Sequence, residues 1–360
     1  MRILVFNSRD IRHPSSGGAE VFTHEVARRW VAAGDSVTLV TSNFSNGLKK
    51  EMVDGVETIR LGNFLSVFCR AKRLYKMKLM GHYDVIIDEY TLRPFMTVKY
   101  AREPVVFLVH ELAREKYFYE LPPILSHLGY YWFEPRWLKR YRKVPTITVS
   151  NSTKDDLISY GFGKIDIVPE GIDFDPIEQV TTKEERPTVL FVGLLKKSNL
   201  VDHVISAFRL ISEKEKNAKL WVVGRGPQLA KLKKLAKGLN VEFFGYVDQE
   251  LKLSLMQKAH VLLVPGIREG WGLVVTEANA CGTPAIGYNV PGLRDSIKDG
   301  VTGLLCDDNS NSLAAATLRF LHDPGQREIL TQNALSWSRE FSWDKTAKSF
   351  RELLWGVVNE

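Results

Sequence analysis

The chain has few cysteines and no long apolar run. Cys69, Cys281 and Cys306 are odd in number and follow no metal-binding or redox spacing, which is typical of a reducing compartment. No apolar stretch approaches the roughly 18–20 residues that a membrane-spanning helix needs. The chain opens on a strand-like run, MRILVFNS, without the long apolar region of a signal peptide. We therefore expect a cytoplasmic protein without a transmembrane helix.

Composition and charge indicate a globular protein with a basic first half. The 360 residues exceed the usual single-domain size of roughly 100–200, which predicts two domains. Hydrophobic residues make up 44% and charged residues 25% of the chain, as in ordinary globular proteins. Lys and Arg outnumber Asp and Glu by 23 to 15 in residues 1–150, but number 26 against 27 in residues 151–360. The positive surplus therefore belongs to the first half.

Strand and helix patterns alternate along both halves. An apolar run at 3–6, a polar loop containing Gly17 and Gly18, and a periodic apolar segment at 19–33 predict strand, loop and helix. Further strands are expected at 36–41, 84–88, 105–109, 146–150, 188–193, 219–224, 241–245 and 261–265. The alternation predicts an α/β fold of two facing Rossmann-like, doubly wound domains with a cleft between them, joined by a polar linker at 176–187.

A glycine-rich turn follows the last of these strands. Gly270 and Gly272 carry no side chains where the turn enters a helix, so the N–H groups of residues 271–273 can meet a phosphate. Glu269 and Glu277 stand eight residues apart, and ionised carboxylates accept hydrogen bonds from sugar or ribose hydroxyls. Recognition of phosphate and hydroxyls together indicates a nucleotide sugar.

The same stretch resembles a known family. EGWGLVVTE, residues 269–277, is similar to the E-x7-E signature of glycosyltransferase family 4, whose members are retaining enzymes with the GT-B fold. ANACGTPAI and PGLRDSIKDGVTGLL continue that family's pattern. RHPSSGGAE, LVHELARE, VVGRGP and FSWDKTAKSFRELL resemble its first loop, a segment after one strand, its V-G-x-G-P motif and its last helices. The resemblance spans essentially the whole chain.

The resemblance implies a role for each part of the chain. Residues 1–175 would form the acceptor-side domain, 176–187 the linker, 188–340 the nucleotide-sugar-binding domain, and 341–360 a helix returning to the first domain. Glu269 would bind donor-sugar hydroxyls and Glu277 the ribose hydroxyls. The phosphates and the donor sugar would be held by backbone N–H groups at Gly270, Trp271, Gly272 and Leu273.

Four further residues receive roles in the same way. Gly17 and Gly18 would let a diphosphate or an acceptor approach the backbone, and Arg225 would lie near the nucleotide. His110 directly follows a predicted strand and would contact the sugar near the reacting carbon. No metal or other cofactor is implied, because helix N-termini and basic side chains stabilise the diphosphate in this family.

The chain departs from the family pattern at two cations. The family usually has an Arg and a Lys that clamp the donor diphosphate, and here Leu194 and Asn199 stand at those positions. Losing such charges weakens stabilisation of the leaving group. Lys196 and Lys197 lie in the same loop, and as flexible point charges they are candidates to replace the missing cations. Solvated loop lysines on a slow or inactive protein are the alternative.

Residues 117–143 are both aromatic and basic, and we call them the basic-aromatic segment. Their rings and charges fit the surface of an anionic membrane, where each basic residue contributes about 1 kcal/mol. A buried aromatic helix pair with a solvated basic face explains the pattern equally well, so both interpretations stay open. Nucleic acid is a less suitable partner, since no recognised nucleic-acid-binding motif accompanies the charge.

The sequence therefore predicts a retaining transferase that moves a hexose from a nucleotide diphosphate sugar to a hydroxyl of a glycan or lipid-linked acceptor, with the protein in the cytoplasm or at the inner face of the membrane. A nucleotide-sugar-binding protein without catalysis is one alternative. Another GT-B enzyme, an epimerase or a phosphorylase, is a second. The donor base, the hexose, the acceptor, the linkage and the oligomeric state are not legible in the residues, because fold does not settle substrate.

Overall fold

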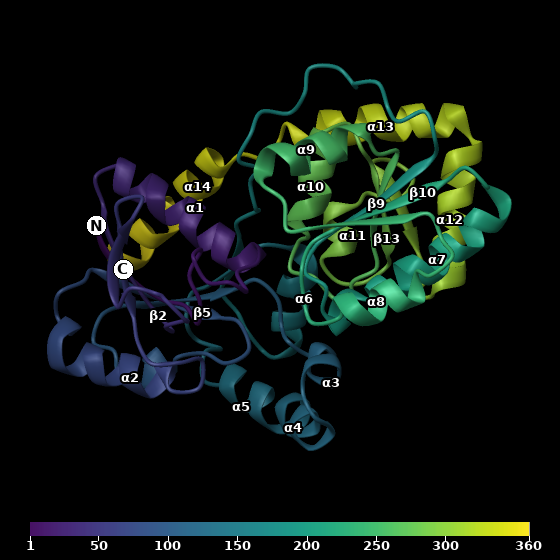
Figure 1. The fold of residues 1–360 in the computed structure, drawn as a ribbon. Coiled ribbons are helices and arrows are strands. Elements are labelled where there is room, and N and C mark those ends of the chain that lie inside the picture. The colour runs from purple at the N-terminus through teal and green to yellow at the C-terminus, as the bar shows by residue number, and fades with distance from the viewer. Residues whose placement is uncertain (360) are drawn as a thin grey trace. The chain divides into compact units, whose positions relative to one another are not determined.

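The computed structural model describes residues 1–359 and contains two compact units (Figure 1). Unit 1 comprises Met1–Tyr117, Leu121–Gly171 and Ser342–Glu360. Unit 2 comprises Phe118–Glu120 and Ile172–Phe341. The last described helix, residues 343–359, thus belongs to unit 1, and the units divide shortly before the predicted linker.

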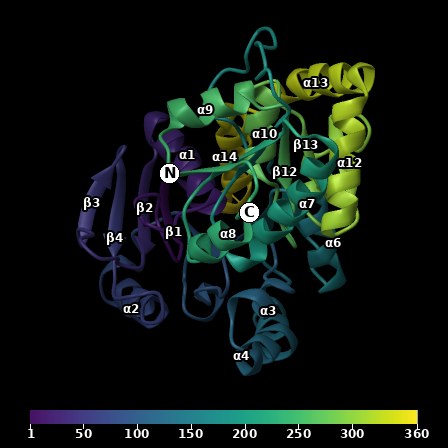
Figure 2. The same cartoon turned by 45° about the vertical axis from the view of Figure 1, so that its right-hand side comes forward.

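Unit 1 is built on a sheet of eight strands. Their bounds are β1 (Arg2–Phe6), β2 (Ser36–Thr41), β3 (Lys50–Val53), β4 (Val56–Arg60), β5 (Val85–Tyr90), β6 (Val105–Val109), β7 (Thr146–Thr148) and β8 (Ile165–Ile167). The order is β3-β4-β2-β1-β5-β6-β7-β8, and all neighbours are parallel except the hairpin β3–β4. Figure 2 labels the first four strands of this order. The central strands are buried on both faces, as their continuous apolar runs predict.

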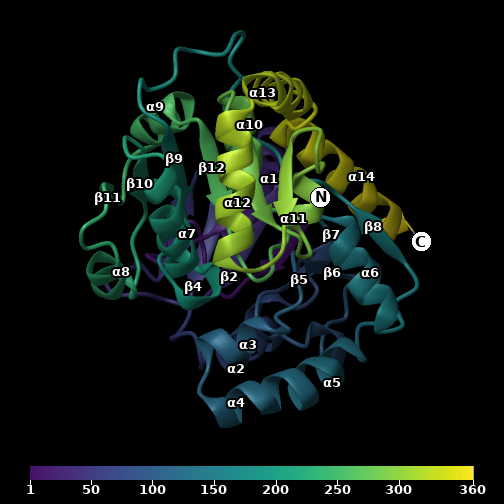
Figure 3. The ribbon, with the colours of Figure 1, turned by 90° about the vertical axis from the view of Figure 1, so that its right-hand side faces the viewer.

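Helices cover both faces of this sheet. The helices of unit 1 are α1 (Gly18–Ala32), α2 (Val67–Leu74), η1 (Tyr75–Leu79), η2 (Thr97–Lys99), α4 (Pro123–Leu128), η3 (Gly129–Phe133), α5 (Glu134–Leu138), α6 (Asn151–Ser159) and α14 (Trp343–Asn359). α3 (Lys116–Glu120) is divided, since its last three residues belong to unit 2. α1 and α14 lie side by side on one face, where the indole nitrogen of Trp30 donates to Ala347 O at 2.8 Å (Figure 1). α2, α4 and α5 lie on the opposite side (Figure 3).

Unit 2 is built on a parallel sheet of six strands. They are β9 (Thr188–Val192), β10 (Lys219–Val223), β11 (Val241–Gly245), β12 (Val261–Val264), β13 (Ala285–Tyr288) and β14 (Gly303–Cys306), in the order β11-β10-β9-β12-β13-β14. The helices are η4 (Lys197–Asn199), α7 (Val201–Lys214), α8 (Leu229–Leu235), α9 (Gln249–Lys258), α10 (Leu273–Ala280), α11 (Leu293–Ser296), α12 (Ser310–His322) and α13 (Pro324–Ser338). One core contains α7, α8 and α12, and the other α9 and α10.

The predicted α/β architecture is confirmed: each unit has a parallel sheet covered by helices, and every expected strand forms with its ends shifted by two residues or fewer. The hairpin β3–β4 and the strands β8, β13 and β14 were not predicted. No helix within residues 1–359 is long and apolar enough to cross a membrane.

Candidate functional site

The loops of unit 2 converge where the strand order reverses. β9 lies between β10 and β12: the chain runs outward from β9 through β10 to β11, and then returns to the other side of β9 with β12 and continues outward to β14. In doubly wound sheets, the crevice beyond the carboxyl ends of strands at such a switch point is the usual ligand site. Lys196, Lys197, Arg225, and Glu269 to Leu273 all follow these three strands. The fold therefore brings the predicted donor residues of unit 2 to one edge.

The loops after β9 and β10 are packed backbone against backbone. Leu195 N donates to Arg225 O at 2.9 Å. A Cβ at Gly224 would lie 1.8 Å from Gly193 O, so only glycine permits this approach. Lys196 is half-buried and Lys197 is exposed at the start of η4. Two candidate cations are thus held on a loop whose backbone is fixed by its neighbour.

Leu194 and Asn199 have structural roles in this loop. The Asn199 side-chain amide donates to Leu194 O at 2.9 Å and closes the turn. Arg225 is exposed, and its guanidinium lies 4.9 Å from the centroid of the Tyr246 ring. The Asn199 side chain therefore stabilises the conformation of the loop from the position where the family usually has a lysine.

The loop after β12 is held by the loop after β13. Glu269 N donates to Pro291 O at 3.1 Å, and a Cβ at Gly292 would lie 2.0 Å from Glu269 O. Gly292 has φ +82°, and Gly272, which precedes α10, has φ +95°. Both conformations favour glycine. These constraints fix the backbone at the start of α10.

Three backbone N–H groups at this helix start have no acceptor. Those of Trp271, Gly272 and Leu273 donate to no other group in the described part of the chain. The Trp271 ring turns inward, where its Nε1 donates to Thr276 Oγ1 at 2.8 Å and its ring centroid lies 5.2 Å from that of Phe341. The tryptophan side chain therefore anchors the loop, and its backbone faces the helix terminus, where anions are favoured.

The two glutamates differ in their surroundings. Glu277, half-buried on α10, accepts a hydrogen bond from Lys252 of α9 at 2.8 Å. Glu269 is also half-buried, and one of its carboxylate oxygens would lie 2.6 Å from a Cβ at Gly266. Lys252 was not predicted, because its contact with Glu277 joins helices far apart in the sequence.

In unit 1, the glycine loop precedes α1. Gly17 N already donates to Glu20 Oε2 at 2.6 Å, and Arg9 donates to the other oxygen at 2.9 Å. Gly18 is exposed at the first position of the helix. The N–H of Gly17 therefore takes part in capping α1 through Glu20, a contact that the sequence pattern did not predict.

His110 follows β6 and is buried, with only 5% of its surface exposed. Its Nε2 lies 3.2 Å from Glu89 Oε1 and its Nδ1 lies 3.8 Å from Glu170 Oε1, and Phe22 packs edge-on against the ring. Thr23 donates to the other Glu89 oxygen at 2.6 Å. Sequence reasoning missed both carboxylates as partners of His110; the only signal was the acidic end of strand VIIDEY.

The two carboxylates control the charge of His110. Burial lowers the pKa of the imidazole, but the negative charges of Glu170 and Glu89 and the hydrogen bond with Glu89 outweigh burial and raise the pKa to about 10. The ring is therefore an imidazolium at neutral pH. Its Nδ1 is ion-paired with Glu170 at 3.8 Å, which is beyond hydrogen-bond distance, and it has no closer acceptor among residues 1–359.

Two parallel α/β units, with a glycine loop and paired glutamates at the switch point of the second, define the GT-B class of glycosyltransferases. Residues 16–176 match the family model described as Glycosyltransferase Family 4, and residues 173–337 match Glycosyl transferases group 1. A D-inositol 3-phosphate glycosyltransferase of Actinosynnema mirum is 30% identical over 352 residues, covering 89% of this chain and 82% of the relative. The chain belongs to glycosyltransferase family 4.

Other relatives and solved structures agree with this assignment. An uncharacterized glycosyltransferase of Methanocaldococcus jannaschii is 28% identical over 368 residues, covering 92% of each chain. Sucrose-phosphate synthase from Thermosynechococcus elongatus has a TM-score of 0.79 at 23% identity, covering 98% of each chain. Anabaena Alr3699/HepE, solved in complex with UDP-glucose, has a TM-score of 0.76 at 18% identity, covering 99% of this chain and 100% of that one. These structural likenesses establish the GT-B fold.

Proposed function

We propose that this glycosyltransferase moves a hexose, with retention of configuration, from a nucleotide diphosphate sugar to a hydroxyl acceptor. The observation that carries the proposal is the start of α10, where three N–H groups without acceptors stand beside Glu269 and one helical turn before Glu277. N–H groups at a helix terminus suit a diphosphate, and carboxylates suit hydroxyls. The complex of HepE with UDP-glucose shows that another protein with this fold binds such a donor.

Each candidate residue has a proposed part in this reaction. The N–H groups at 270–273 hold the phosphates, Glu269 binds the sugar, and Glu277 binds the ribose. Lys196 and Lys197 offset the charge of the leaving diphosphate without a metal ion. His110, as an imidazolium, donates from Nδ1 to a sugar hydroxyl and cannot act as a base at neutral pH.

Gly17, Gly18 and Arg225 have smaller parts in the proposed reaction. Gly18 leaves the start of α1 open to the diphosphate or the acceptor, while the Gly17 N–H stays with Glu20. Arg225, exposed beside Tyr246, borders the nucleotide. Retention proceeds by same-face attack, in which the leaving phosphate accepts the proton of the acceptor hydroxyl. Exclusion of water during this step protects the donor from hydrolysis.

A panel of nucleotide diphosphate sugars tests the activity. One donor should be consumed in the presence of a hydroxyl acceptor, and proton NMR of the product should show the anomeric configuration of the donor. Inversion would contradict same-face attack. Donor binding without transfer to any acceptor would favour the alternative raised by Leu194 and Asn199, a binding protein without catalysis.

We further propose that the acceptor is lipid-linked and that unit 1 docks on an anionic membrane at the cytoplasmic face. In the basic-aromatic segment, Ile124, Tyr131 and Trp132 are 78%, 62% and 56% exposed. Tyr117, Leu138 and Tyr141 of the same segment are buried, so only part of it is available to a membrane. Arg136, Lys139 and Arg140 are exposed on the same segment, so apolar and positive groups share one surface.

A second element extends this surface. α2 and η1 carry five exposed basic residues, Arg70, Lys72, Arg73, Lys76 and Lys78, and no acidic residue. The Arg93 guanidinium lies 4.7 Å from the ring centroid of Phe68 on α2 and 5.8 Å from that of Trp137 on α5. α2, α4 and α5 lie along one side of unit 1 (Figure 3). Together they supply the charge and apolar area that hold a protein at an anionic leaflet.

Vesicle flotation tests the membrane contact. The protein should float with vesicles of phosphatidylcholine and phosphatidylglycerol at a ratio of about two to one, and not with phosphatidylcholine alone. Ile124→Ser should weaken binding about tenfold, because an exposed isoleucine loses its burial in lipid. Ile329→Ser removes an isoleucine that is 61% exposed on α13 and should change nothing. Equal effects of the two variants would contradict the assigned surface.

A further inference from the structure

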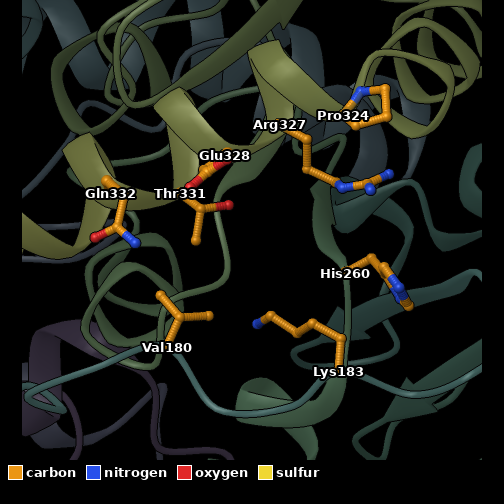
Figure 4. A pocket seen from close by; sticks show the side chains of 8 residues that line it. All are labelled: Val180, Lys183, His260, Pro324, Arg327, Glu328, Thr331 and Gln332. Carbon is orange, nitrogen blue, oxygen red and sulfur yellow. The ribbon is translucent and has the colours of Figure 1, made fainter.

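A cavity of about 350 Å³ lies at the opposite edge of the unit 2 sheet from the donor loops. His260 stands directly before β12, and Lys183 comes from the segment before β9. Arg327, Glu328, Thr331 and Gln332 line the cavity from α13 (Figure 4). The amino ends of strands and one long helix thus border an open pocket, in which charged and polar side chains lie beside Val180 and Pro324.

Lys183 brings a positive charge without a carboxylate partner. Its ammonium donates to Gln257 O at 2.9 Å, Gly282 O at 2.7 Å and Thr283 Oγ1 at 2.7 Å, and within residues 1–359 it forms no ion pair. Burial lowers its pKa to about 8, so most of the lysine remains charged at neutral pH. In Figure 4 the amine points into the open space. A partly buried charge among neutral oxygens favours an anion nearby.

His260 adds a hydrogen-bond donor in a positive environment. Its Nδ1 accepts from Thr188 N at 3.1 Å, so the neutral ring carries its proton on Nε2. Burial lowers its pKa to about 4, and the positive charges of Arg327, Lys183 and Lys219 act in the same direction against Glu184. Glu184 is itself paired with Lys219 at 2.5 Å. The charges around this ring therefore disfavour a cation and favour an anion.

The α13 side of the cavity offers further unused groups. Arg327 donates from Nη1 to Leu321 O at 2.9 Å, and its other nitrogens have no acceptor in the described part of the chain. The Thr331 hydroxyl and the Gln332 amide also lack protein partners there. Glu328 is exposed and pairs with neither cation, which leaves its carboxylate able to accept from hydroxyl groups.

We propose that this cavity binds a small phosphorylated metabolite that carries hydroxyl groups. Arg327 and the Nε2 of His260 donate to its phosphate, the charge of Lys183 attracts it, and Glu328, Thr331 and Gln332 take its hydroxyls. The volume suits a molecule of metabolite size. Lys183 also holds the turn after α10, so the site is physically connected to the far end of the helix that carries Glu277. The proposal does not depend on the proposed transfer reaction.

NMR titration of the His260 ring tests the site, since a bound phosphate must raise the pKa of an adjacent imidazole. Inorganic phosphate should shift the His260 midpoint upward by about one pH unit or more, whereas sodium chloride at equal ionic strength should not. Glucose 6-phosphate should act at concentrations about tenfold lower than inorganic phosphate, and glucose should have no effect. Equal potency of the two phosphates would contradict the hydroxyl contacts.

A matched pair of arginine variants locates the response. Arg327→Gln should abolish the shift while retaining a polar side chain, and Arg319→Gln, at an exposed arginine of α12, should leave it unchanged. Lys183→Met should also abolish it, but this variant loses three hydrogen bonds, so Arg327→Gln decides. If phosphate leaves the titration midpoint of His260 in the parent protein unchanged, the proposal is wrong. This holds even if phosphate binds at the loop before α10.

Discussion

At the scale of single residues, the charge of His110 sets what the unit 1 site can do. Its two ring nitrogens face Glu89 and Glu170, and their effect exceeds that of burial. The pKa is raised above its unfolded value of about 6.5 to about 10. The resulting stabilisation is fully present below pH about 6.5 and is lost as the pH rises through about 10. An imidazolium cannot act as a base, so hydrogen-bond donation to a sugar is the role that we propose for His110.

This charge makes a stability prediction. His110→Gln should reduce the free energy of unfolding by about 3–5 kcal/mol at pH 6, because two buried carboxylates lose their partner. The difference from the parent protein should shrink toward pH 10, as measured by urea denaturation at several pH values. His322→Gln, which removes an exposed histidine paired with Glu215, is the control and should cost little. A pH-independent difference would mean that His110 is neutral in the folded protein.

At the scale of elements, the donor loop is a backbone structure that glycines make possible. The loops after β12 and β13 approach so closely that Gly292 has no room for a Cβ beside Glu269 O. The start of α10 is therefore fixed by a neighbouring loop and by the inward ring of Trp271, not by its own short helix. Donor binding should depend on this packing even at a residue that touches no ligand.

Two glycine variants separate packing from conformational strain. Gly292 and Gly238 have nearly equal φ angles of +82° and +81°, but a Cβ at Gly238 meets nothing within 4 Å. Gly238→Ala should lose about 1–2 kcal/mol of stability through the positive φ angle alone, and Gly292→Ala should lose more because its Cβ also meets Glu269 O. Only Gly292→Ala should also weaken donor binding, by tenfold or more, as measured by calorimetry. Equal binding by the two variants would show that the loop contact does not position the site.

Over the whole molecule, the sequence pattern predicted those strands that are buried along their full length and those candidate residues that lie close together in the sequence. The buried strands β1, β5, β6 and β12 are apolar runs, and the residues from Glu269 to Glu277 lie within one short string. The hairpin β3–β4 was not predicted because β3 is short, polar and largely exposed. The partners of His110, Glu89 and Glu170, were not predicted, and neither was Lys252, the partner of Glu277. Tertiary packing brings these residues together, and their spacing in the sequence does not indicate the contacts.

The loop at the start of α10 should bind a nucleotide diphosphate sugar, which thermal-shift binding against a panel of donors can measure. One donor should raise the melting temperature of the parent protein in a concentration-dependent way. Glu277→Gln should weaken that donor by about 10–100-fold through the lost ribose contact, whereas Lys252→Met, which removes only the partner of Glu277, should retain binding within about threefold. Equal losses in both variants, or no stabilisation by any nucleotide sugar, would contradict the account.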